Sequence, residues 1–154
     1  MKIAGLCSVF LLLTILTFSC KSVKTDTQGI MGQVYWLEGN QMPQMVEEGK
    51  EVQRPEKKGA ARTIRIHQLT HINQARLGDY LFGDIETPLV AEVETDDQGR
   101  FSVELPVGKY SVFTVEESGY FANIFDLDSY INPIEVEKGE WTQADILVNY
   151  EAAY

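Results

Sequence analysis

Two histidines stand four residues apart in the segment IHQLTH, at His67 and His71. The spacing is similar to the helical zinc-protease motif, but Gln68 stands where that motif needs a glutamate general base. In a strand, at about 3.3 Å per residue, the two rings would lie roughly 13 Å apart, too far to share a metal. In a helix they could chelate weakly, but no third ligand is indicated. We therefore predict no metal site and no cofactor, with both histidines exposed or at an interface.

Acidic side chains come in pairs at three places, which are Asp96-Asp97, Glu116-Glu117 and Asp126-x-Asp128. Calcium takes six to eight oxygen ligands in such settings, but none of the pairs has the complete EF-hand spacing. The first pair lies in a DDQG turn, where aspartate is favoured for its own backbone hydrogen bonds. Calcium binding therefore stays an alternative.

The sequence contains no nucleophile-elbow serine, phosphate loop or dinucleotide fingerprint. We assign no catalytic residue and expect the protein not to be an enzyme. A cryptic hydrolase remains the second alternative, because an enzyme would need a site that the sequence hides.

The first residues are typical of an export signal. Met1 and Lys2 precede an uncharged run from Ile3 to Phe18, and the stretch LTFSC, which ends at Cys20, is similar to a bacterial lipobox. The polar run KSVKTDTQ follows directly, so a permanent membrane-spanning helix is the weaker interpretation. Cys20 would be the only cysteine of the mature chain, with no disulfide partner in an oxidising compartment. We predict lipidation of Cys20, and residues 21–28 as a tether to a membrane.

The charge is strongly acidic and unevenly distributed. Residues 20–78 hold nine basic and six acidic side chains, net +3, whereas residues 79–154 hold three basic and seventeen acidic ones, net −14. This balance makes nucleic acid an unexpected partner. It has two interpretations, namely solubility with repulsion from anionic membranes, or a loop at residues 50–62 that folds back across an acidic sheet.

Short alternating segments between turn residues predict an all-β fold. Residues 39–62 lack a sustained period and are expected to be a loop insertion. Residues 73–82 are ambiguous, with room for one helical turn. The turns DDQG and PVG predict an antiparallel meander of the third to fifth strands. The seven expected strands are residues 29–39, 63–69, 89–95, 100–105, 109–116, 134–137 and 144–150. The expected core residues are Val34, Trp36, Phe101, Val103, Leu105, Tyr110, Val112, Ile146 and Val148.

The run VETDDQGRFSVELPVGKYSVFTVEESGY carries a resemblance to a known family. Its threonine, glycine and phenylalanine around the first turn, its LPVGKY and its closing GY resemble the carboxypeptidase regulatory-like domain, a transthyretin-like β-sandwich. The resemblance spans about residues 29–150 and implies a seven-stranded antiparallel β-sandwich of transthyretin/prealbumin type. The segments YFANIFD and INPIEVEKGEW are also similar to free-standing lipoproteins of Bacteroidota that carry this domain.

Related folds include two chemistries that this chain does not match. A transthyretin-like hydrolase of the purine pathway ends in tyrosine-arginine-glycine-serine, whereas this chain ends YEAAY. Collagen-adhesin repeats link a first-strand lysine to a last-strand asparagine. Asn149 is present, but the first strand GQVYWLEG has no lysine.

The sequence places one candidate ligand surface near the closing glycine-tyrosine. Its rings could stack on a sugar or a peptide and its carboxylates could add polar contacts. The alternatives are that the rings seal the core and that the aspartates cap a turn. The surface residues are Tyr120, Phe121, Phe125, Tyr130, Asp126 and Asp128.

The expected organisation is a lipoprotein signal peptide at 1–19, a tether at 20–28 and one sandwich domain at 29–154. We expect a non-catalytic, extracytoplasmic accessory or binding module of the cell envelope, lipid-anchored at the outer membrane. Its partners would be the membrane, through the lipid, and an envelope protein or a glycan. A small-ligand or calcium-binding protein is the alternative.

Overall fold

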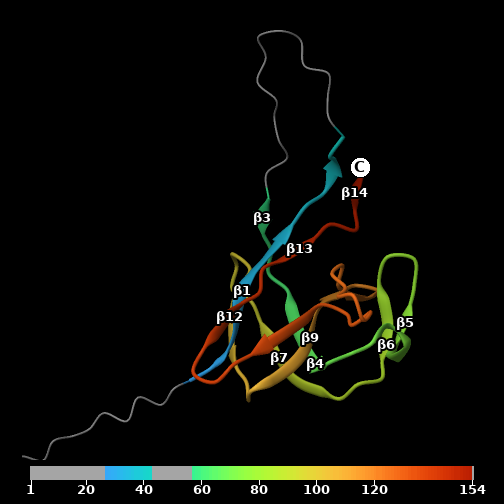
Figure 1. Ribbon diagram of the computed structural model, residues 1–154. Helices are drawn as coiled ribbons and strands as arrows, with labels where there is room; N and C mark the ends of the chain where they lie inside the picture. Colours follow the sequence, from blue (N-terminus) through green and yellow to red (C-terminus); the bar gives the residue numbers. More distant parts are fainter. Residues whose placement is uncertain (1–26, 43–56, 154) are drawn as a thin grey trace, which may run out of the picture.

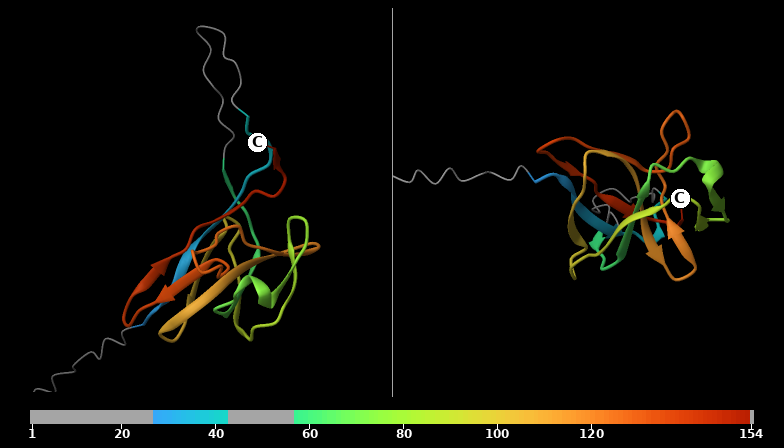
Figure 2. Two further views of the ribbon diagram at one scale, coloured as in Figure 1. Left: turned by 45° about the vertical axis from the view of Figure 1, so that its right-hand side comes forward. Right: turned by 90° about the horizontal axis from the view of Figure 1, so that it is seen from below.

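The computed structural model describes residues 27–42 and 57–153, which form an all-β sandwich (Figure 1). Two sheets pack face to face, and a short helix and two loops cover one end of the larger sheet (Figure 2). Both the all-β class and the sandwich were predicted from the alternating segments, and both are confirmed.

The larger sheet has the strand order β5-β6-β10-β9-β4-β7, and β11 also pairs with β9. All its pairings are antiparallel. The short 3₁₀ helix η1, Ile72–Gln74, lies just before β5. The strands are β4 Thr63–Gln68, β5 Ala75–Leu77, β6 Phe82–Ile85, β7 Leu89–Glu94, β9 Gly108–Glu116, β10 Gly119–Phe121 and β11 Pro133–Val136.

The smaller sheet is built around β1, Gly29–Trp36. On one edge β1 pairs antiparallel with β8 and then with β3, and on the other it pairs parallel with β12 and then with β13. Its other strands are β3 Lys58–Gly59, β8 Arg100–Glu104, β12 Trp141–Gln143 and β13 Ile146–Val148. A separate parallel pair joins β2, Gly39–Asn40, to β14, Ala152–Ala153.

Each of the seven expected strands is present within a few residues of its predicted ends. The expected helical turn in residues 73–82 corresponds to η1. The remaining strands have two to four residues each, too short to give a recognisable alternation.

The predicted meander is wrong. β7 pairs with β4 and β9 lies on the other side of β4, whereas β8 belongs to the smaller sheet and pairs with β1. The two turns therefore carry the chain from one sheet to the other instead of closing hairpins within one sheet. A turn sequence specifies how the chain reverses, but it does not specify which sheet the next strand joins.

The main core lies between the sheets, and a second cluster of Phe82, Phe113, Ala122 and Ile131 lies on the opposite face of the larger sheet. Because both faces of β9 are covered, its residues from Tyr110 to Thr114 are buried without interruption. Seven of the nine predicted core residues are buried, and Trp36 and Val103 pack against the core while partly exposed. The sequence-based core list omitted the second cluster.

Tyr110 joins the core to the turn before it. Its ring is buried and its hydroxyl donates a hydrogen bond to the carbonyl of Pro106, 2.8 Å away. The expected burial of Tyr110 is confirmed, and its hydroxyl has a partner.

Several predictions concern residues outside the described ranges. They include the signal peptide, lipidation of Cys20, most of the tether and positions 43–56 of the insertion. In the part of the chain that the structure describes, no helix has the length and apolar character needed to cross a bilayer.

Candidate functional site

The loop from Asp126 to Tyr130 is held by its first residue. Asp126 Oδ1 accepts hydrogen bonds from the backbone N–H groups of Asp128 and Tyr130, at 3.0 and 2.8 Å. The N–H of Asp126 donates to the carbonyl of Tyr130, and the N–H of Ser129 donates to the carbonyl of Asp126, both at 3.2 Å. The loop is therefore locally fixed, and Asp126 caps the turn as one of the sequence-based alternatives foresaw.

This loop strains its backbone and exposes an apolar side chain. Ser129 has φ of 65° and Asn132 has φ of 39°, a region in which non-glycine residues are uncommon. Leu127, at the loop apex, is fully exposed. Fixed loops that carry unfavourable features of this kind are frequent at binding sites.

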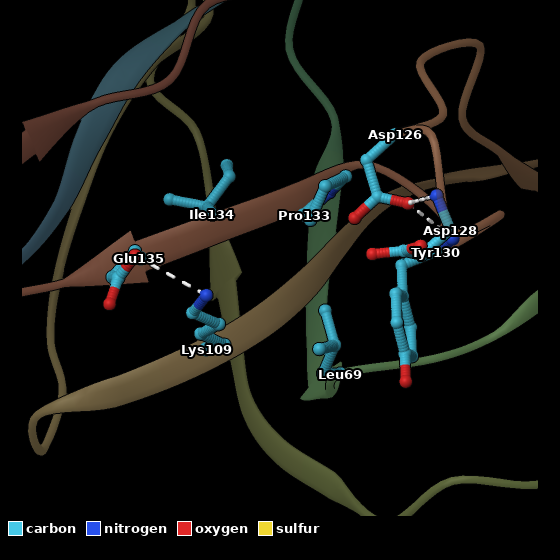
Figure 3. Close-up of a pocket in the computed structure, with 8 residues that line it drawn as sticks. All are labelled: Leu69, Lys109, Asp126, Asp128, Tyr130, Pro133, Ile134 and Glu135. Atoms are coloured by element: carbon cyan, nitrogen blue, oxygen red, sulfur yellow. Dashed lines mark hydrogen bonds and ion pairs between the residues drawn. The ribbon is translucent and has the colours of Figure 1, made fainter.

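A pocket of about 300 Å³ lies between this loop and strands β9 and β11. Figure 3 shows Asp126, Asp128 and Tyr130 at one end and Lys109 with Glu135 at the other. The Lys109 ammonium lies 3.6 Å from the Glu135 carboxylate, and both side chains are more than half exposed. Leu69, Pro133 and Ile134 supply the apolar part of the wall between the two ends.

The pocket unites three of the six predicted surface residues with five others, of which two, Lys109 and Glu135, are charged. Asp126, Asp128 and Tyr130 are close in sequence, so their proximity could be expected. Lys109 and Glu135 come from separate strands and meet only because β9 and β11 pair in register. The pocket thus has three carboxylates and one ammonium, an excess of negative charge.

The other predicted surface residues do not line this pocket. Phe121 is 3% exposed and belongs to the main core, so its assignment to a ligand surface was wrong. Tyr120, its neighbour on β10, points to the opposite face, where its hydroxyl accepts a hydrogen bond from the Arg65 guanidinium. Phe125 is 44% exposed and contacts Phe82 across 6.3 Å between ring centroids, so it partly seals the second cluster.

His67 is buried, at 7% exposure, which corrects the expectation of an exposed or interfacial ring. Its Nδ1 hydrogen-bonds to the carbonyl of Thr87 at 2.8 Å, and its Nε2 has no partner among the described residues. The ring packs edge-on against Phe113. Burial holds the pKa of His67 below its ordinary value, so the neutral form is favoured.

His71, unlike His67, caps a helix. Its Nδ1 accepts a hydrogen bond from the N–H of Asn73, and the side chain of Gln74 accepts one from the N–H of His71. Together these contacts cap η1. The ring also packs edge-on against Tyr130, so His71 supports one wall of the pocket.

A buried polar cluster that was not predicted from the sequence lies at the other end of the sandwich. The Glu116 carboxylate, 3% exposed, is 3.1 Å from Arg62 Nε and accepts hydrogen bonds from Thr114 and Tyr150. Arg62 also lies over the ring of Trp36. Burial, and secondarily Glu116, raise the pKa of the Tyr150 hydroxyl. Because every group here has a partner, the cluster suits a structural role that joins the two sheets.

Within residues 27–42 and 57–153, no cluster of three or more histidine, cysteine, aspartate or glutamate side chains is arranged to hold a metal ion. Asp126 and Asp128 come close in the pocket, but Asp126 Oδ1 is already occupied by two backbone donors.

Comparison with family models, with curated proteins and with solved structures gives no match for this chain. The fold and the local geometry therefore carry the functional argument.

Proposed function

We propose that this protein is a non-catalytic accessory module of the cell envelope, anchored by a lipid on Cys20, that binds a partner polypeptide in the pocket between β9, β11 and the Asp126–Tyr130 loop. The supporting observation is that a locally fixed loop, an aromatic ring and an excess of carboxylates meet in one pocket. The carboxypeptidase regulatory-like resemblance and a Bacteroidota origin belong to the same proposal, since they rest on sequence motifs alone.

A binding role is preferred to a catalytic one because four of the described acid–base groups already have structural partners. Asp126 holds a turn, His71 caps η1, and His67 is buried with its Nδ1 on a backbone carbonyl. Glu116 is surrounded by its three partners. A general base needs access to the proton that it removes, and burial denies this access to His67 and Glu116.

The charge of the pocket favours a ligand with a basic side chain. Asp126, Asp128 and Glu135 face one ammonium, that of Lys109, which Glu135 partly neutralises. A lysine or arginine of a partner would place its charged end near Asp128 and its alkyl chain along Pro133 and Ile134. Tyr130 would cover the same chain from the side of the loop.

The pocket can be tested with a matched pair of lysine substitutions. Asp128→Lys changes the third residue of the Asp126 loop, and Gln98→Lys changes the equivalent residue of a similar loop at Asp96. Both side chains are exposed, so neither variant should unfold the domain. In pull-downs from detergent-solubilised envelopes, Asp128→Lys should lose the partner and Gln98→Lys should keep it. Equal capture by both variants would contradict the proposed pocket.

The anchor needs a separate experiment. Cys20→Ala should abolish metabolic labelling with a fatty-acid analogue and release the protein from the membrane fraction, because stable attachment requires the acyl chains. Unchanged membrane retention of this variant would refute the lipid anchor and leave the pocket unaffected.

A further inference from the structure

The outer face of the smaller sheet carries a second depression, of about 300 Å³. It is formed by strands β1, β8 and β12 and by Asp145, which lies between β12 and β13. It belongs to a different sheet from the pocket described above. Apolar atoms form the larger part of its surface, and Gln33, Tyr35, Ser102, Gln143 and Asp145 contribute polar groups beside Met31.

Hydrogen bonds fix the polar side of this groove before any ligand arrives. Asp145 Oδ1 accepts from the backbone N–H of Gln33 at 3.0 Å and from Gln143 Nε2 at 2.6 Å. The Tyr35 hydroxyl donates to Gln33 Oε1 at 2.9 Å. These bonds orient Gln143 so that its Oε1 is left as an acceptor, and Ser102 beside it has no side-chain partner among the described residues.

The register of the strands places two exposed apolar side chains, those of Met31 and Trp141, next to these polar groups. Met31 pairs with Ser102 on β8 and with Gln143 on β12, and it is 40% exposed. Two residues earlier, Gly29 pairs with Trp141. A Cβ at Gly29 would lie 2.1 Å from the carbonyl oxygen of Val103 and 3.0 Å from Cζ3 of the indole, so a side chain here would meet the backbone of β8 as well as the ring.

The two tryptophans of the chain are used differently. Trp36 is covered by Arg62 and packs edge-on against Tyr150. Trp141 is 36% exposed, and its indole N–H has no partner among the described residues. An exposed indole beside a free amide oxygen and a hydroxyl offers an apolar surface with polar groups at its edge, a combination that suits a sugar ring.

We propose that this groove, together with Trp141 beside it, binds a neutral oligosaccharide. The C–H faces of the sugar rings would lie on Trp141 and Met31, and the hydroxyls would bond to Gln143 and Ser102. A neutral ligand fits because the charged groups are already engaged: Arg100 pairs with Asp96, and Asp145 holds its two donors.

The length of the groove favours an oligosaccharide over a single sugar. The side chains in question run from the level of Gly29 to that of Gln33, four residues along β1. At about 3.3 Å per residue this is roughly 13 Å. A protein partner or a second copy of this chain is less well suited, because an interface core needs a larger apolar area than Met31 and Trp141 provide.

The test is a titration of the whole mature protein, carrying Trp36→Phe so that fluorescence reports Trp141 alone. The probes are cellohexaose and chitohexaose, with a galacturonic acid hexamer as the acidic control. Millimolar additions of at least one neutral probe should shift the emission saturably, and the acidic probe should bind at least tenfold more weakly. The variant Ser102→Arg, which fills the groove without changing Trp141, should weaken binding at least tenfold.

Three results would overturn the saccharide site: no saturable shift with either neutral probe, binding that survives Ser102→Arg, or a shift that tracks self-association in sedimentation. Trp141→Ala, read by isothermal titration, serves as the second variant, and its thermal unfolding checks that it folds. Asp128→Lys should leave sugar binding unchanged, so failure of this site and failure of the polypeptide pocket are distinguishable.

Discussion

Two loops of this protein share one hydrogen-bonding pattern and differ in what they present. In the loops 96–100 and 126–130, Oδ1 of the first aspartate accepts from the N–H groups of the third and fifth residues. In both, the first N–H donates to the fifth carbonyl and the fourth N–H donates to the first carbonyl. The fourth residue has positive φ in each, 81° at Gly99 and 65° at Ser129.

The difference lies in the residues that this common backbone carries. The first loop has glycine at the strained position, polar residues at its tip and an extra ion pair between Asp96 and Arg100. It connects the two sheets, and Gly99 is buried against Val34 and Ala60. The second loop has serine at the strained position and a fully exposed leucine at its tip, and it borders the pocket. The structural loop thus has the residue types that its backbone and its exposure favour, whereas the loop at the proposed binding pocket departs from them at Leu127 and Ser129.

The largest expected contrast concerns the aromatic residue that accompanies each loop. Phe101 is buried between the sheets, so Phe101→Ala should lower the free energy of unfolding by about 3–5 kcal/mol. Phe125 is 44% exposed, and Phe125→Ala should cost about 1 kcal/mol or less. Chemical denaturation of both variants measures this, and equal losses would show that the second loop is as much part of the core as the first.

Exchanging the fourth residues should change stability in opposite directions. A Cβ at position 99 would lie 2.3 Å from the carbonyl oxygen of Val34, so Gly99→Ser should destabilise the protein by about 2–4 kcal/mol. Ser129→Gly removes a strained φ and should stabilise the protein by about 0–1 kcal/mol. The gain is small because the entropy that glycine adds to the unfolded chain offsets part of it. A loss of stability in Ser129→Gly would mean that the serine side chain contributes more than its backbone costs.

Removing the capping carboxylates should separate stability from binding. Asp126→Ala leaves two N–H groups without their acceptor and should cost about 1 kcal/mol. Asp96→Ala should cost more, since it also breaks the contact with Arg100. Only Asp126→Ala should reduce capture of the envelope partner. Reduced capture by both, measured at a temperature where both variants are folded, would attribute the effect to general loss of structure.

The smallest expected effect is a pH dependence confined to the first loop. The backbone N–H of Arg100, with its guanidinium and the N–H of Gln98, holds the pKa of Asp96 below its ordinary value of 3.8. A carboxyl whose folded pKa is depressed stabilises the protein above the unfolded value and loses this contribution as the pH falls through the folded pKa. The stability difference between wild type and Asp96→Asn should therefore shrink on acidification below about pH 4. A difference independent of pH would exclude the carboxylate as its source.

The alternation of apolar and polar residues predicted the strands correctly. The predictions that were wrong depend on which strands pair and on which face a side chain lies. Alternation along residues 100–105 identifies a strand, but nothing in that segment shows that it pairs with β1 instead of its neighbours in sequence. In the same way, the adjacent positions Tyr120 and Phe121 were assigned together to a surface. A strand sends neighbouring side chains to opposite faces, and one of them was bound to enter the core.

The residues of the candidate site also differ in whether the sequence could predict them. Asp126, Asp128 and Tyr130 could be predicted as a group because they lie within five residues. Lys109 and Glu135 could not, since their meeting depends on the register of β9 with β11. The groove on the smaller sheet was missed for this reason too, because it combines side chains from three strands of which two run parallel.

The most direct test of the binding role is site-specific crosslinking at the tips of the two loops in intact cells. A photoreactive phenylalanine replaces Leu127 in one variant and Asp97, the equivalent residue of the first loop, in the other. We predict a discrete protein adduct from position 127 that disappears when Asp128→Lys is added, and no corresponding adduct from position 97. The same adducts from both positions, or an adduct at 127 that persists with Asp128→Lys, would contradict the account.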